Sequence, residues 1–126
     1  MTYDCPMKNY RQRMGAWGEQ AATDYLIRQG YIILTRNFRT PHGEIDILAL
    51  HGDLLVFVEV KTRTSRAYGY PEDSVTLRKQ EHMLAAAEHY LQGHPEAGEN
   101  WQFDVISVEH GSDRAPVITH FENVIA

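Results

Sequence analysis

Three ionisable residues stand inside the most hydrophobic part of the sequence, and their types suit metal chemistry. Asp46, Glu59 and Lys61 lie within residues 43–61, two apolar runs joined by a Gly-Asp turn at positions 52 and 53. A two-residue turn there places Asp46 directly opposite Glu59 on the neighbouring strand. Opposed residues have Cβ atoms roughly 4.5 to 5.5 Å apart, so two carboxylates at this spacing repel each other unless a cation lies between them. Two converging carboxylates form an oxygen site for a divalent cation such as Mg²⁺ or Mn²⁺.

One face of the predicted hairpin gathers four charges. Side chains alternate between the faces of a strand, so Glu44 and Lys61 project from the same side as Asp46 and Glu59, with Glu44 opposite Lys61. One interpretation is a solvated lattice of salt bridges on an exposed sheet face. Val, Ile, Leu and Phe occupy both faces of the two strands, however, which favours a central hairpin covered on both sides.

The composition is that of a single globular domain. The chain has 126 residues, of which 43% are hydrophobic and 23% charged, which excludes a disordered or fibrous chain. No apolar run approaches the roughly 20 residues that span a bilayer, and the N-terminal residues lack the apolar core of a secretion signal. We therefore expect a cytoplasmic protein with no membrane segment. A single cysteine, Cys5, excludes an internal disulfide.

The charge is unevenly distributed along the chain. The formal net charge is −5, which argues against binding nucleic acid through bulk electrostatics. Residues 1–80 nevertheless hold eleven Lys or Arg against nine Asp or Glu, whereas residues 81–126 hold only Arg114 against eight acids. If metal masks the acids of the hairpin, the basic half offers a local phosphate-binding face.

A first helix is predicted over residues 14–29, after a frayed segment over residues 1–12. Glu19 lies on the apolar stripe of this helix. Its carboxylate either points inward or lies at the edge of the stripe, where a helix N-terminus favours negative charge.

A second helix is predicted over residues 75–91, with Ser74 as its N-cap. Gln80 is the polar member of its inward stripe. It either contacts a site residue or only marks the margin of the stripe. Arg78 and Lys79 are expected to be exposed, as helix charges usually are.

Three further strands complete the predicted sheet, over residues 31–38, 101–109 and 116–121. The first precedes the hairpin and forms a three-stranded meander with it. The second helix returns the chain to the strand at 101–109 by a crossover. The predicted fold class is therefore α/β, with a mixed central sheet flanked by helices.

A polar segment follows the hairpin, over residues 62–73. It mixes Arg63 and Arg66 with Tyr68 and Tyr70, residue types that hold phosphates and stack on bases. The alternative is an ordinary loop without a ligand, and both interpretations stay open.

The order of the elements, and the acids that they carry, resemble the PD-(D/E)XK nuclease superfamily. An acid lies on the first helix, an Asp on the second strand and a Glu-X-Lys on the third. Within this superfamily the chain is similar to the uncharacterised YraN-type family, relatives by fold of Holliday junction resolvases, over about residues 15–106. The similarity rests on Gly15 with Gly18-Glu19, Gly43-Glu44-Ile45-Asp46, Glu59-Val60-Lys61-Thr62-Arg63, Ser74-Val75 through Lys79-Gln80, and Phe103-Asp104-Val105-Ile106.

The resemblance implies a restriction-endonuclease-like αβββαβ core with a metal-dependent site. Asp46 and Glu59 would be metal ligands, with the Val60 carbonyl as a third ligand and Glu19 completing the site. Lys61 would orient the attacking water. The implied cofactor is Mg²⁺ or Mn²⁺, the implied partner is DNA, and cleavage of two strands implies a homodimer. The implied catalytic residues are Asp46, Glu59, Lys61, Glu19 and Gln80.

The sequence thus predicts a metal-dependent endonuclease that hydrolyses phosphodiester bonds of structured or branched DNA. The net acidity of the chain leaves two alternatives. One is a non-catalytic nucleic-acid-binding or partner-binding module that keeps the nuclease fold. The other is a scaffold with an ion network on its sheet.

Overall fold

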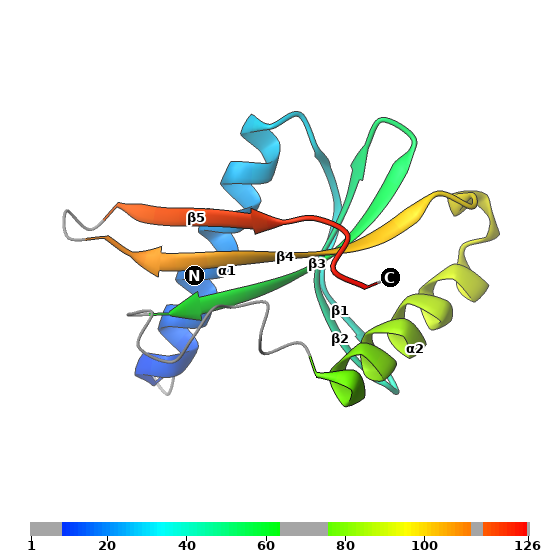
Figure 1. Ribbon diagram of the computed structural model, residues 1–126, viewed down its shortest axis with the longest axis horizontal. Coiled ribbons are helices and arrows are strands. Elements are labelled where there is room, and N and C mark those ends of the chain that lie inside the picture. Colours follow the sequence, from blue (N-terminus) through cyan, green and yellow to red (C-terminus); the bar gives the residue numbers. More distant parts are fainter. Residues whose placement is uncertain (1–8, 64–75, 112–114, 126) are drawn as a thin grey trace, which may run out of the picture.

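A central sheet with a helix on each face forms the body of the protein (Figure 1). The computed structural model describes residues 9–63, 76–111 and 115–125. The order confirms the predicted αβββαβ core, to which β5 adds a strand. The elements are α1 (Tyr10–Arg28), β1 (Ile32–Thr40), β2 (Gly43–His51), β3 (Leu54–Arg63), α2 (Leu77–Gly93), the 3-10 helix η2 (Pro95–Ala97), β4 (Trp101–His110) and β5 (Pro116–Phe121).

The sheet is mixed and runs in the order β1-β2-β3-β4-β5. Neighbouring strands are antiparallel except β3 and β4, which are parallel because α2 carries the chain back across the sheet between them. β2, β3 and β4 are therefore interior strands, and they hold most of the buried side chains. The prediction of a central, covered hairpin is confirmed.

Two hydrophobic clusters fill the space between the sheet and the helices. On the α1 side, Leu26 belongs to one cluster with Val58. On the α2 side, Tyr90 meets Phe57 edge to face, with ring centroids 6.0 Å apart. Phe57 and Val58 are consecutive, so they point to opposite faces of β3, and each face is covered by its own helix. No helix in the described ranges has an apolar stretch long enough to cross a bilayer.

α1 begins earlier than predicted and lies close to β3. Asn9 closes a capping box, so residues 9–12, predicted to be frayed, form the cap and first turn of the helix. Gly18 is buried where α1 meets β3, and a Cβ at this position would overlap the Thr62 hydroxyl. This close approach brings Glu19 to the sheet.

α2 begins at Leu77, two positions after the predicted start. Thr76 is its N-cap, and the Thr76 hydroxyl accepts a hydrogen bond of 3.2 Å from the backbone N–H of Lys79. Ser74, the predicted N-cap, lies outside the described residues. Leu77 is 78% exposed, since it lies outside the buried face of α2, which contains Tyr90.

The β2–β3 hairpin opens into a fork at the end away from its turn. The predicted register holds for five residue pairs, up to Ile47 and Val58, as a two-residue turn at positions 52 and 53 requires. Beyond that pair the ladder stops, and Figure 1 shows β1 and β2 running toward α2 while β3 continues beside β4 and β5. The next residues, Asp46 and Glu59, therefore lie on the two arms of the fork.

Candidate active site

Asp46 is the first residue of β2 beyond the paired part of the β2–β3 ladder. At this point its carboxylate makes the hydrogen bond to β3. Its Oδ2 accepts a hydrogen bond of 2.8 Å from the backbone N–H of Val60. Burial, together with the charges of Glu59, Glu19 and Glu44, raises the pKa of Asp46 to about 6, against the lowering effect of this bond. Four acids therefore gather near one end of the hairpin. A buried carboxylate near other acids is stabilised when it binds a proton or a cation.

Glu59 of β3 lines a cavity that it shares with Asp46, and its two carboxylate oxygens have different surroundings. Oε1 lies 3.4 Å from the Lys61 ammonium and 2.5 Å from the Lys79 ammonium. Oε2 is buried and has no hydrogen-bond partner within the part of the chain that the structure describes. A buried carboxylate oxygen without a donor is unfavourable, so Oε2 is a ready position for binding a cation.

The two lysines beside Glu59 differ in how firmly they hold a proton. Burial lowers the pKa of Lys61, and Lys79 lowers it further, while Glu59 opposes the change. Burial also acts to lower the pKa of Lys79, but contacts with Glu59 and Lys61 and the charge of Asp46 raise it overall. The pKa values of the two lysines are therefore shifted in opposite directions beside the same carboxylate.

Glu19 approaches the site from α1, but its carboxylate is held by β1. Oε1 accepts hydrogen bonds from Arg36 Nε at 3.0 Å and from Asn37 Nδ2 at 2.9 Å. The side chain is 13% exposed, so it points inward and does not lie at the stripe's edge. The Glu19 charge still contributes to the raised pKa of Asp46. Glu19 therefore acts on the site through its charge.

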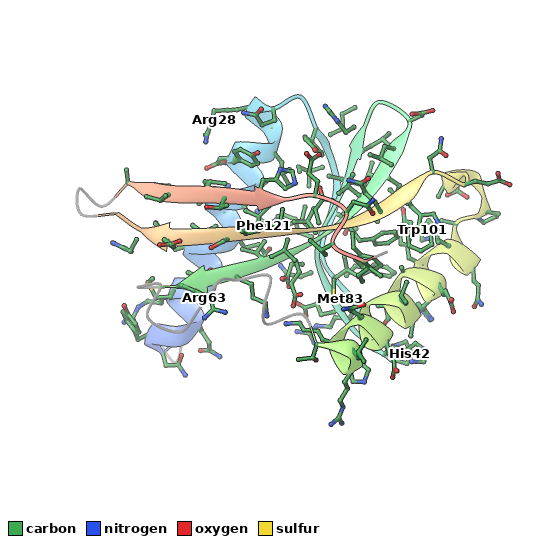
Figure 2. The ribbon with its side chains drawn as sticks, in the orientation of Figure 1. Arg28, His42, Arg63, Met83, Trp101 and Phe121 are labelled. Atoms are coloured by element: carbon green, nitrogen blue, oxygen red, sulfur yellow. The ribbon has the colours of Figure 1, made fainter. Side chains whose placement is uncertain are left out.

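A cavity of about 190 Å³ lies between the fork and α2. Phe57 and Phe103 form an apolar part of its wall. Figure 2 shows Met83 of α2 and His42 of the β1–β2 turn on this side of the molecule. The cavity is small for an organic cofactor. Its polar lining residues are Glu44, Asp46, Glu59, Lys79, His42 and His82.

Neither of the two predicted charged pairs, Asp46 with Glu59 and Glu44 with Lys61, forms in the described ladder. Glu44 instead pairs with Arg39 of β1, whose Nε lies 3.4 Å from Glu44 Oε2. The reason is the fork, which separates β2 from β3 before this position is reached. Val60 holds Asp46 through its backbone N–H, and its carbonyl as a metal ligand stays a prediction.

Other predicted residues lie away from this cavity or cannot be placed. Gln80 is half-buried on α2 and does not line the cavity. Arg63 lies at the outer end of β3, away from Met83 (Figure 2), with its Nε buried and unpartnered among the residues described. The predicted nucleic-acid contacts Arg66, Tyr68 and Tyr70 lie outside the described residues.

The cavity is also lined by Lys79 and His82, to which the sequence assigned no role. The sequence predicts an exposed Lys79, yet its side chain is only 30% exposed. Met83 and Tyr90 follow Lys79 four and eleven positions later, at the spacing of one helix face. This spacing is the sequence signal that places Lys79 on the inward face of the helix. His42 and His82 are exposed and carry no comparable pattern.

A second group of metal-type ligands lies elsewhere in the protein. Asp104, His120 and Glu122 each offer one ligand atom, and these atoms lie within 4.8 Å of one another. No other trio of acidic, histidine or cysteine ligands in residues 9–63, 76–111 and 115–125 meets this spacing. The predicted trio of Glu19, Asp46 and Glu59 is therefore set wider apart.

Asp104 is already supplied with hydrogen-bond donors. It is fully buried, and its Oδ1 accepts from Gln102 Nε2 and from the backbone N–H of Asn123, both at 2.9 Å. His120 Nε2 lies 2.6 Å from Oδ2, and the Tyr25 hydroxyl lies 3.0 Å from His120 Nδ1. These contacts join α1, β4 and β5, so the group has a structural explanation that needs no ion.

The comparison with known proteins assigns a family. The model of the "Uncharacterised protein family UPF0102" matches residues 18–108, a span that contains Glu19, Asp46, Glu59 and both lysines of the site. The chain belongs to the UPF0102 family. The predicted YraN-type family is thereby confirmed.

Relatives in the UPF0102 family match along most of the chain. A UPF0102 protein of Syntrophotalea carbinolica is 47% identical over 115 residues, which cover 91% of this chain and 93% of that protein. One of Chlorobaculum parvum is 52% identical over 101 residues, covering 80% and 78%. One of Chloroflexus aurantiacus is 42% identical over 121 residues, covering 95% and 96%. These names assign the family and no activity.

One solved structure, that of Pyrococcus furiosus SfsA in complex with Ca²⁺, is weakly similar to the chain. The TM-score is 0.41 at 16% sequence identity, with 90% of this chain and 64% of that chain covered. A likeness at this level supports no conclusion about the site.

Proposed function

We propose that this UPF0102 protein is a cytoplasmic, metal-dependent endonuclease that hydrolyses phosphodiester bonds in structured or branched DNA. The observation that carries the proposal is the buried Oε2 of Glu59, which has no partner among the described residues and lies next to the cavity that Glu59 shares with Asp46. Burial and repulsion raise the pKa of Asp46 to about 6, and a divalent cation would relieve both.

The donor set at the fork fits a hard divalent cation, Mg²⁺ or Mn²⁺. Asp46 and Glu59 supply carboxylate oxygens, and the Val60 carbonyl is the third candidate ligand, all of the type that such ions prefer. Glu19 and Glu44 add negative charge nearby. When bound, such an ion lowers the pKa of a coordinated water and neutralises phosphate oxygens.

The residues of the site have distinct tasks in the proposed hydrolysis. The Val60 N–H fixes the orientation of the Asp46 carboxylate. Lys61, whose ammonium contacts Glu59, orients the attacking water, and the proton of that water passes to solvent. As the water oxygen bonds to phosphorus, the bond to the leaving oxygen breaks. Nearby ammonium groups stabilise the negative charge of the transition state.

A second candidate is a non-catalytic module that binds nucleic acid or a protein partner. The cluster partly balances its own charge, because Lys61 and Lys79 contact Glu59 while Arg36 contacts Glu19. The net charge of −5 provides no bulk attraction for nucleic acid, so it favours a protein partner for such a module. A gel shift that persists in EDTA, without cleavage under any divalent metal, would support this candidate.

Cleavage of a DNA panel tests the proposal. Duplex, forked and four-way DNA are incubated with Mg²⁺ or Mn²⁺ and with wild type, Asp46→Asn, Glu59→Gln or the control Asp53→Asn, at the exposed hairpin turn. Wild type and Asp53→Asn should cleave branched DNA, and the other two should not. Equal activity in all four proteins, or none with any metal, would contradict the proposal. Size-exclusion chromatography with four-way DNA tests the dimer that cleavage of two strands requires.

A further inference from the structure

Lys79 occupies a position that the stability of its helix does not explain. It lies in the first turn of α2, where a positive charge opposes the helix dipole. Its side chain is 30% exposed and lines the cavity beside Glu59, whereas the preceding Arg78 is exposed. A lysine held inward at the unfavourable end of a helix indicates a role in the cavity.

Both lysines that contact Glu59 approach the same oxygen of its carboxylate. Lys61 and Lys79 both approach Oε1, at 3.4 and 2.5 Å, while Oε2 is buried without a partner among the described residues. Two cations beside one carboxylate oxygen repel each other, so one of them transfers readily to another anion. Lys79 is the better candidate, because it is more exposed than Lys61, at 30% against 21%.

We propose that Lys79 binds a phosphate group of the DNA and contacts Glu59 only while no phosphate is present. This inference rests on the proposed function, since it assigns the phosphate contact of the same site. When phosphate draws the ammonium away from Oε1, Glu59 loses a positive neighbour and binds a divalent cation more tightly. Phosphate and metal therefore strengthen each other's binding, and this coupling is reciprocal.

Mn²⁺ binding without DNA gives the first half of the test. The signal of free Mn²⁺ in electron paramagnetic resonance is followed for wild type, Lys79→Ala, Lys79→Arg and Arg28→Ala. Arg28 is an exposed cation at the far end of α1 from His42 (Figure 2) and is the matched control. Removing the ammonium from Glu59 should tighten Mn²⁺ binding about fivefold in Lys79→Ala and leave Arg28→Ala unchanged.

DNA binding gives the second half. The fluorescence anisotropy of labelled four-way DNA is measured in Ca²⁺ with the same proteins. Lys79→Ala should bind the DNA about fivefold more weakly, whereas Lys79→Arg and Arg28→Ala should bind as wild type does. Opposite changes in the two assays identify a phosphate contact, because a variant that merely disturbs the site would weaken both.

The outcomes separate this inference from the function on which it rests. Unchanged or weaker Mn²⁺ binding by Lys79→Ala, or unchanged DNA binding, would overturn the role of Lys79 and leave the proposed nuclease intact. If wild type bound no Mn²⁺, the proposed function and this inference would both be overturned. Melting temperatures check folding, and Lys79→Gln replaces Lys79→Ala if the latter unfolds.

Discussion

Asp46 and Asp104 are two carboxylates of the same sheet whose surroundings give them opposite roles. Asp104 is fully buried and contacts the Gln102 side chain, the Asn123 backbone and His120. Asp46 accepts its one described hydrogen bond from a backbone N–H, and burial together with three neighbouring acids raises its pKa. The comparison indicates that a fully paired buried charge stabilises the fold, whereas an underpaired one is available to a ligand.

Activity should separate the two aspartates most strongly. Asp46→Asn should lower kcat/KM for Mg²⁺-dependent cleavage by about a thousandfold, since it removes a proposed metal ligand. Asp104→Asn, assayed well below its unfolding temperature, should lower it by less than about tenfold, since Asp104 does not line the cavity. Similar losses of kcat/KM in both variants, measured on four-way DNA, would contradict the different roles of the two aspartates.

The free energy of unfolding should depend more on Asp104 than on Asp46, which is the reverse of the effect on activity. Asp104→Ala should lower the free energy of unfolding by about 3 kcal/mol, because it leaves His120, the Gln102 amide and the Asn123 N–H without their acceptor. Urea denaturation at pH 7 measures the loss. A change below about 1 kcal/mol would show that the Asp104 contacts do not stabilise the fold.

The placement of Glu19 near Asp46 should depend on the absence of a side chain at Gly18, which allows α1 to approach β3 closely. Gly18→Ala should cost about 2 kcal/mol of unfolding free energy, because the new methyl group overlaps the Thr62 hydroxyl. Gly15→Ala is the matched control on the same helix, where a Cβ meets nothing within 4 Å, and should stabilise by about 0.5 kcal/mol. Thermal melts of the two variants compare them. Equal effects would mean that α1 does not depend on this close approach.

The smallest expected effect is the pH dependence of Asp46. Its pKa is about 6 in the folded protein against 3.8 as the ordinary value, so ionisation of Asp46 costs stability as pH rises through 6. Asp46→Asn should therefore be more stable than wild type by about 1 to 2 kcal/mol at pH 8, and this gain should disappear below pH 4. Urea titrations across this range measure it. A gain that is equally large at pH 4 would exclude ionisation as its cause.

The turn and the alternation of residues allow most of the hairpin to be predicted from the sequence. Gly52 and Asp53 fix the register, and the apolar faces on both sides of β3 require helices above and below it. The fork could not be predicted in this way, because the period of two continues through Asp46 and Glu59 although the strands separate there. The pattern reports side-chain direction, and it does not report whether two strands remain paired.

The candidate site could be predicted only in part, for a related reason. Asp46, Glu59 and Lys61 are local to one hairpin, so the face of the sheet that they share follows from the alternation of side chains. The contacts of Glu19 with Arg36 and Asn37, and of Lys79 with Glu59, join separate elements. They depend on how each helix is rotated against the sheet, which a charge on a helix does not reveal by itself.

A titration with Mn²⁺ followed by two-dimensional amide NMR tests the central claim most directly. Paramagnetic Mn²⁺ broadens the signals of the residues nearest to it, so it shows which carboxylates bind. The amides of Asp46, Glu59 and Val60 should disappear first in wild type and persist in Asp46→Asn. Earlier broadening around Asp104, His120 and Glu122, or no localised broadening at all, would contradict a metal site at the fork.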